Sequence, residues 1–312
     1  MMARHLAQRV GQALLVLAAT FTLAFLLLQA LPGDAVLIKF LELGLTPDQL
    51  AEIRLAYGAD APLWRQYLHT AGGFLTGNFG TSIRAGVPVA QLLAENLPAT
   101  LLLAALAFAA ASLLALLLAG LATLGGQSWL RGLVRSVPSL FVAVPVFWLG
   151  IMLIQLFSFQ LGWISIISPE PWEELALPVA TIAVPISAPL AQVLIRNIDA
   201  VLAEPFVAVA RAKGASHAWV LRWHVARNAL LPTLTMAGVL FGELLGGAVV
   251  TEAVFGLNGL GGLTQQAVAN QDVAVLQAIV VVSAAAFVLI NLAVDLLYPV
   301  LDPRLARGRR AA

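Results

Sequence analysis

The residues of this chain that could do chemistry are few, and they are acids rather than nucleophiles or metal ligands. Glu243 lies deep inside a long apolar stretch, and Glu252 lies at its end. The chain has no cysteine and its four histidines show no metal-ligand spacing, so no metal site is predicted. A carboxylate within an apolar stretch long enough to cross a membrane is a functional candidate by default, so Glu243 and Glu252 are candidate pathway residues, and a hydrogen bond to another helix is the alternative interpretation.

A glycine-rich stretch between Gly256 and Gly262 is the other candidate, because glycine-rich loops bind phosphates. No lysine follows it, and the chain contains no G-x-x-x-x-G-K-[ST] sequence. A nucleotide-binding loop is therefore not predicted. Catalysis within a membrane would need paired groups at one depth, and Glu243 has no such companion. We predict no catalytic residue and no cofactor on this chain.

The segment between Arg196 and Arg227 carries local signals for two short helices. Pro205 suits a first helical turn, and Gly214 suits the residue that ends a helix. Ser216 can cap a second helix that carries Trp219. The pattern predicts a protruding helical hairpin, and an amphipathic hairpin lying on the membrane surface is the alternative.

These segments belong to a chain of 312 residues that is 61% hydrophobic and only 11% charged. A soluble domain carries about a quarter charged residues, so lipid must be the solvent for most of this surface. The net charge of +1 argues against nucleic acid as a partner. Long uncharged runs, each near the roughly 20 residues that cross a bilayer, predict an all-α integral membrane protein with six transmembrane helices.

The predicted boundaries alternate spans with connecting segments. The spans are 10–31, 98–124, 136–160, 176–196, 229–251 and 274–300. The segments between and around them include 1–9, 32–97, 197–228, 252–273 and 301–312. The first span is longer than the apolar core of a cleaved signal peptide, so we expect a retained anchor. Segment 252–273 is rich in Gly, Asn and Gln, which predicts an irregular outer loop, or irregular backbone in a protein-lined cavity.

Basic residues indicate the orientation. Most of the 17 Lys and Arg lie in segments on the side of the two termini, which predicts cytoplasmic N- and C-termini. The long segment 32–97 then lies outside. A capping pattern at 46–49 and the proline at position 62 predict about two helices there. Docking of an external partner is one interpretation of this segment, and a spacer is the other.

Motifs along nearly the whole chain resemble one family. PFVAVARAKGASHAWVLRWHVARNALLPTLT (205–235) resembles the cytoplasmic EAA-like loop of permease subunits of peptide, opine and nickel ABC importers. Further similar motifs are GNFGTSIRAGVPV (77–89), PVFWLG (145–150), GELLGGAVVTEAVFGLNGLG (242–261) and DLLYPVLDPR (295–304). Asn78 stands where the family usually has Asp, and Asn258 where it usually has Pro. These departures lie on the outer side and bear on the substrate more than on the mechanism.

The resemblance implies a type I ABC importer permease fold in a bacterial cytoplasmic (inner) membrane, with a small helical periplasmic segment after span one. It implies a homologous second permease subunit, two ATPase subunits that bind ATP and Mg²⁺, and an extracytoplasmic substrate-binding protein. The implied contact with an ATPase is at Ala208, Ala210, Arg211, Ala212, Lys213, Gly214 and Ala215.

Substrate and mechanism leave alternatives. Di- and oligopeptides are the leading substrates that the resemblance implies, and nickel, metal chelates, opines and glutathione are the alternatives. A self-sufficient secondary transporter is a more distant hypothesis, because it would need ion-coupling acids in several spans. This chain offers one deep acid, Glu243.

Overall fold

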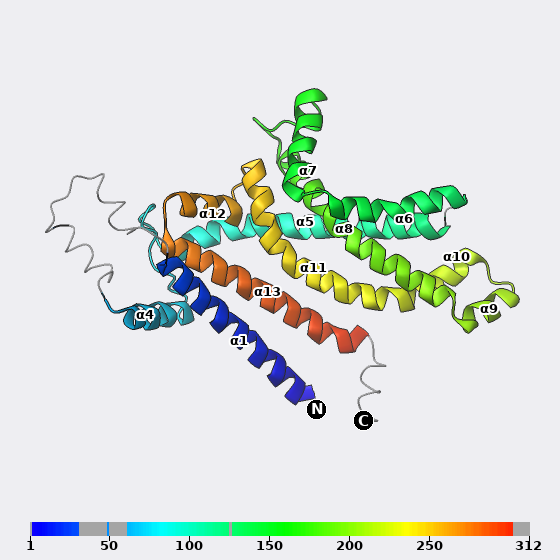
Figure 1. Cartoon of the computed structure of the whole chain (residues 1–312), viewed down its shortest axis with the longest axis horizontal. Helices are drawn as coiled ribbons and strands as arrows, with labels where there is room; N and C mark the ends of the chain where they lie inside the picture. The colour runs from blue at the N-terminus through cyan, green and yellow to red at the C-terminus, as the bar shows by residue number, and fades with distance from the viewer. Residues whose placement is uncertain (1, 31–48, 50–60, 125–126, 302–312) are drawn as a thin grey trace. The chain divides into compact units, whose positions relative to one another are not determined.

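The computed structural model describes residues 2–30, 49, 61–124 and 127–301, and its regular elements there are helices with one isolated β-bridge between Thr81 and Pro88 (Figure 1). The helix expected near 46–58 and the segment 302–312 lie outside the described residues. The chain divides into two compact units. Unit 1 is Met1–Thr100 with Gly256–Leu289, and unit 2 is Leu101–Phe255 with Ile290–Ala312.

Unit 1 is built on α1 (Met2–Gln29), α4 (Leu63–Leu75), the start of α5 (Val89–Leu124), α12 (Leu260–Ala269) and most of α13 (Val273–Leu301). The amphipathic helix predicted after Pro62 is α4. It packs on α1 through edge-to-face aromatic contacts, with Tyr67 5.5 Å from Phe21 between ring centroids. A second apolar cluster joins α5, α12 and α13, and its buried members include Val89, Leu93, Leu260 and Val275.

The prediction that 252–273 is an irregular loop is wrong for most of this segment. α11 (Ala226–Phe255) extends to Phe255, inside the segment predicted as a loop. The ten residues Leu260–Ala269 then form the helix α12. Its apolar residues Leu260, Leu263 and Ala267 share one face and are buried. The first amide of the helix is satisfied from a distant part of the chain, because Leu260 N–H donates to Thr100 Oγ1 at 2.8 Å. Burial and this bond outweigh the low helix propensity of the glycines.

Unit 2 centres on α8 (Pro171–Leu202), which packs against α6 (Ser128–Ala143), α7 (Val146–Leu153) and α11. α8 begins earlier than the predicted span at 176–196, because Glu170 and Glu173 form a capping box around Pro171. A proline is favourable at this first position, since the helix needs no amide hydrogen there. The remaining elements are the π-helical turn η1 (Ile154–Gln160), α9 (Pro205–Ala212), α10 (His217–Val220) and the π-helical turn η2 (Leu221–Val225).

The segment expected as a span at 136–160 is not one straight helix. α6 and the helix formed by α7 and η1 meet at a bend of 102°. The break lies at Val144, whose backbone is extended with φ −89° and ψ 122°, followed by Pro145 at the start of α7. A proline disfavours helical backbone in the residue before it, which explains the break.

Helix length and composition agree with a membrane protein. Among the described residues four helices are long and apolar enough to cross a bilayer, and up to six crossings result if each of two bent pairs is counted as one. The four are Ala7–Gln29, Val89–Leu124, Pro171–Leu202 and Val273–Ala293. The four single helices overlap the predicted spans 10–31, 98–124, 176–196 and 274–300, the predicted span 136–160 lies within the first bent pair, and the predicted span 229–251 overlaps only the second helix of the other pair, Asn228–Leu244.

Candidate functional site

The candidate site is the hairpin formed by α9 and α10, which connects α8 to α11 (Figure 1). α9 begins as the sequence predicts, with Glu204 in the extended N-cap position and Pro205 in the first turn. Arg211 lies in the last turn, where a positive charge is favourable beside the carbonyl end of the helix dipole. We call residues 205–225 the coupling hairpin.

Gly214 produces the reversal between the two helices. Its φ is +88°, a left-handed conformation that glycine adopts without strain. The amide of Gly214 donates to Arg211 O at 2.9 Å, and the amide of Ala215 donates to Ala210 O at 3.1 Å. These two bonds form a Schellman motif. A side chain at Gly214 would meet nothing within 4 Å, so the requirement for glycine is one of backbone conformation and not of space.

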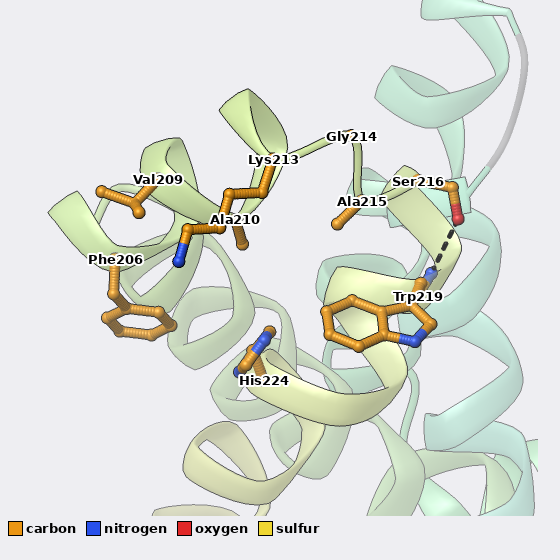
Figure 2. A pocket seen from close by; sticks show the side chains of 9 residues that line it. All are labelled: Phe206, Val209, Ala210, Lys213, Gly214, Ala215, Ser216, Trp219 and His224. Carbon is orange, nitrogen blue, oxygen red and sulfur yellow. Dashed lines mark hydrogen bonds between the residues drawn. The ribbon is translucent and has the colours of Figure 1, made fainter.

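Ser216 starts the second helix, as predicted. Its backbone is extended, and its hydroxyl oxygen accepts a hydrogen bond from Trp219 N at 3.3 Å (Figure 2). α10 then continues through η2 into α11. The second arm of the coupling hairpin is therefore continuous with a long helix of unit 2.

A groove of about 640 Å³ lies between the two arms. Its lining residues are Phe206, Val209, Ala210, Lys213, Gly214, Ala215, Ser216, Trp219 and His224 (Figure 2). The ring of His224 lies between the two other rings, 5.0 Å from Trp219 and 6.0 Å from Phe206 between centroids. Phe206 is 41% exposed and Trp219 is 47% exposed. The groove is therefore an apolar surface that is open to an occupant.

The opposite side of the coupling hairpin is anchored in the core of unit 2. Val207, Val220 and Val225 are at most 1% exposed and pack with residues of α5, α6, α8 and α11. Polar contacts add a second attachment, since His217 contacts Arg211 at 3.1 Å and the backbone oxygen of Thr123 in α5 at 3.4 Å. The buried side of the hairpin is thus attached to α5, α6, α8 and α11.

The predicted contact residues divide into two groups. Ala210, Lys213, Gly214 and Ala215 line the groove. Ala208, Arg211 and Ala212 are exposed on the hairpin but do not line it.

The predicted contact residues omit five residues that also line the groove, namely Phe206, Val209, Ser216, Trp219 and His224. Ser216 and Trp219 were predicted only as parts of the second helix. The spacing of Phe206, Val209 and Lys213 by three and four residues places them on one helix face, and this signal was available in the sequence.

The two candidate pathway acids do not form one site. Both lie on α11, but nine residues apart, which is two and a half helical turns and places them on opposite faces. Glu252 is buried, whereas Glu243 is exposed. The face of Glu243 also carries Gly246 and Gly247, where an added side chain would meet nothing within 4 Å.

Two family models match the chain. The first, described as "Binding-protein-dependent transport system inner membrane component", matches residues 111–307. The N-terminal model of the same kind of component matches residues 2–104.

Curated relatives match over almost their whole length. The glutathione transport system permease protein GsiC of Escherichia coli (strain K12) is 36% identical over 282 residues, covering 90% of this chain and 92% of the relative. A candidate peptide transport system permease protein of Brucella melitensis biotype 1 is 36% identical over 312 residues, covering 97% and 99%.

Solved structures show the fold. The MetNI methionine ABC transporter, solved in inward-facing conformations, aligns with a TM-score of 0.57 at 20% identity, covering 68% of this chain and 97% of that chain. An amino acid ABC transporter aligns with a TM-score of 0.51 at 23% identity, covering 69% and 94%. The predicted all-α type I permease fold is confirmed by these similarities.

Proposed function

Because the chain belongs to the family of binding-protein-dependent transport system inner membrane components, we propose that its coupling hairpin receives an ATPase subunit that drives import. The observation that carries the proposal is the open apolar groove between α9 and α10. An exposed apolar groove on a rigid support is typical of a protein-binding surface. ATP and Mg²⁺ would then bind to the partner and not to this chain.

The proposed mechanism transmits movement through the anchored side of the hairpin. Closure of the two ATPase subunits moves the hairpin, and Val207, Val220 and Val225 pass the displacement to the core of unit 2. Two residues separate the end of α8 from the first arm of the hairpin, and η2 leads from the second arm into α11, so we expect both helices to move with the hairpin. Such rigid-body displacement of packed helices is a common way to alternate access to a site.

The proposed substrates are short peptides. The similarity to a permease named for glutathione and to one named for peptides supports this class, since glutathione is itself a tripeptide. The binding protein that delivers the substrate would largely decide which peptide is taken. Nickel, metal chelates and opines are the alternatives.

A homologous second permease subunit is also part of the proposal. The exposed face of α11 that carries Glu243, Gly246 and Gly247 supports it, because small residues permit close approach of another helix. In this arrangement Glu243 lies at the pathway or bonds to a partner helix, and Glu252 stays inside the subunit. Both termini are proposed to be cytoplasmic, in a bacterial inner membrane.

The test is uptake by a strain that lacks this chain, complemented with the wild-type gene. Labelled dipeptide, glutathione and nickel are compared, with and without the proposed ATPase subunits. We expect uptake of at least one of the two peptide substrates, and loss of that uptake when an ATPase is removed. Uptake that persists without any ATPase would overturn the proposed coupling. Restored uptake of nickel alone would overturn the proposed substrate class.

A further inference from the structure

The helix α4 has a face that is fastened to the membrane span α1. Tyr67 Oη and Thr22 Oγ1 are 2.9 Å apart, and Gln29 Nε2 donates to Gln66 Oε1 at 2.9 Å. Phe74 lies 5.2 Å from Phe21 between ring centroids. These contacts fix both ends of α4 against the last third of α1.

The residues of α1 that contact α4 lie within the membrane span. The span is Ala7–Gln29, and Thr22 and Phe21 lie about 10 to 12 Å before its end at 1.5 Å per residue. The hydrocarbon core of a bilayer is about 30 Å thick, so this level falls below the headgroups. α1 also exposes Leu23 and Leu26 there. Lipid that contacts those leucines reaches the depth at which α4 is attached.

A second face of α4 is apolar and is not covered by any other residue that the structure describes. Trp64, Leu68 and Leu75 follow one another at spacings of four and seven residues, which places them on one side of the helix. They are 60%, 59% and 90% exposed. A third side carries the exposed Arg65 and His69. Three such faces, one packed, one apolar and one polar, are the pattern of a helix lying in a membrane interface.

We propose that α4 is an interfacial helix that inserts Trp64, Leu68 and Leu75 among the acyl chains of the leaflet at the Gln29 end of α1. The Arg65 guanidinium lies 5.2 Å from the centroid of the Trp64 ring. A tryptophan at the boundary and an arginine reaching toward headgroup phosphates are typical of this position. The inference requires that the chain is embedded in a membrane, as its family membership implies, and it uses nothing else from the family. It is independent of the coupling hairpin.

The test uses nitroxide labels and the natural lack of cysteine in this chain. Leu68→Cys and Leu75→Cys carry the label on the apolar face. His69→Cys and Gly72→Cys are the matched controls on the polar side, and Gly72 has open space around it. The labelled full chain is purified with its copurifying subunits and reconstituted in phosphatidylethanolamine–phosphatidylglycerol vesicles. Collision of each label with oxygen and with a water-soluble nickel chelate is then measured.

The expected result is a reversal between the two pairs. Labels at 68 and 75 collide more with oxygen than with the nickel chelate, as lipid-exposed sites do, and labels at 69 and 72 show the opposite preference. High collision with the chelate at 68 and 75 would place the face in water and overturn the proposal. Low collision with both reagents at 68 and 75 would mean that another protein covers the face, which would overturn it as well.

Discussion

Two glycine-containing reversals of this chain use their apolar residues in opposite ways. In the coupling hairpin, Phe206 and Trp219 are exposed around a groove. In the segment from Gly256 to Asp272, which we call the inner turn, Leu260 and Leu263 of α12 are buried. The first reversal exposes its apolar side chains on the surface, whereas the second buries its apolar side chains within unit 1.

Their polar groups differ in the same way. The hydrogen bonds of the coupling hairpin are mostly local, such as Ser216 with Trp219. The inner turn is held from far along the chain, because Asp272 is 2% exposed and accepts hydrogen bonds from Ser82 Oγ at 2.5 Å and from Arg84 N at 3.2 Å. Local bonds shape the coupling hairpin, whereas distant buried bonds join parts of one unit.

The largest expected effect comes from Gly214→Pro in the coupling hairpin. Proline requires φ near −65° and has no amide hydrogen, whereas Gly214 has φ +88° and donates to Arg211 O. We expect uptake to fall to the level of a strain without the chain. Membrane abundance should stay normal, since the hairpin lies outside the apolar spans. Transport assays and immunoblots of the same membranes measure both.

Gly214→Asn is the matched control for this prediction. Asparagine tolerates the left-handed conformation better than other residues with a side chain, and nothing lies within 4 Å of the new Cβ. The variant should retain most of the uptake. Normal transport by Gly214→Pro would contradict the role of the reversal, and loss of both variants from the membrane would show a folding defect instead.

The second prediction concerns the inner turn, where we expect a substitution to lower the stability of the fold. Asp272→Ala removes the acceptor of Ser82 and of the Arg84 amide in a buried place. We expect a loss of about 2–3 kcal/mol in unfolding free energy, because each buried polar group left unpaired costs about 1–3 kcal/mol. Thermal unfolding of the purified chain measures it. Adding Ser82→Ala to this variant should cost less than Ser82→Ala costs alone, because the bond between Ser82 and Asp272 is already lost and only the acceptor of the Ala85 amide is removed in addition. Full additivity would contradict the proposed pair.

The same contrast explains what could be predicted from the sequence. The coupling hairpin could be predicted from Pro205, Gly214 and Ser216. Each of these residues starts or ends a helix through interactions with residues close by in the sequence. α12 was missed because its support comes from Thr100 and from burial of Leu260, neither of which local composition reveals.

Two further differences have equally physical causes. The bend at Val144 was missed because counting uncharged residues measures the length of a span and not its direction. The signal was Pro145, which disfavours helix in the preceding residue. The opposite faces of Glu243 and Glu252 follow from helical spacing, but which of them is buried depends on packing that no local pattern contains.

The third prediction concerns the groove alone. Trp219→Ala removes a large exposed ring from the lining, so the unfolding free energy of the chain should hardly change. Affinity for the proposed ATPase partner should fall by about 2 kcal/mol, roughly thirtyfold, as for a tryptophan at the centre of an interface. Trp223→Ala is the control, since Trp223 is even more exposed, at 60% against 47% for Trp219, but does not line the groove. Equal weakening by both variants would contradict the assignment of the groove, and binding titrations distinguish the two results.

The smallest effect tests whether the bonds of the hairpin are as local as its geometry indicates. Ser216→Ala removes the acceptor of the Trp219 amide, a cap worth about 1 kcal/mol. Because α10 continues into η2 and α11, the loss should loosen only the first turn and leave the rest of the helix unchanged. Hydrogen exchange should be faster at residues 217–220 and unchanged in the inner turn, and Ser216→Asp should restore protection. Faster exchange that extends into α11 would mean that the cap supports the whole arm, and the contrast between local and distant bonds would then fail.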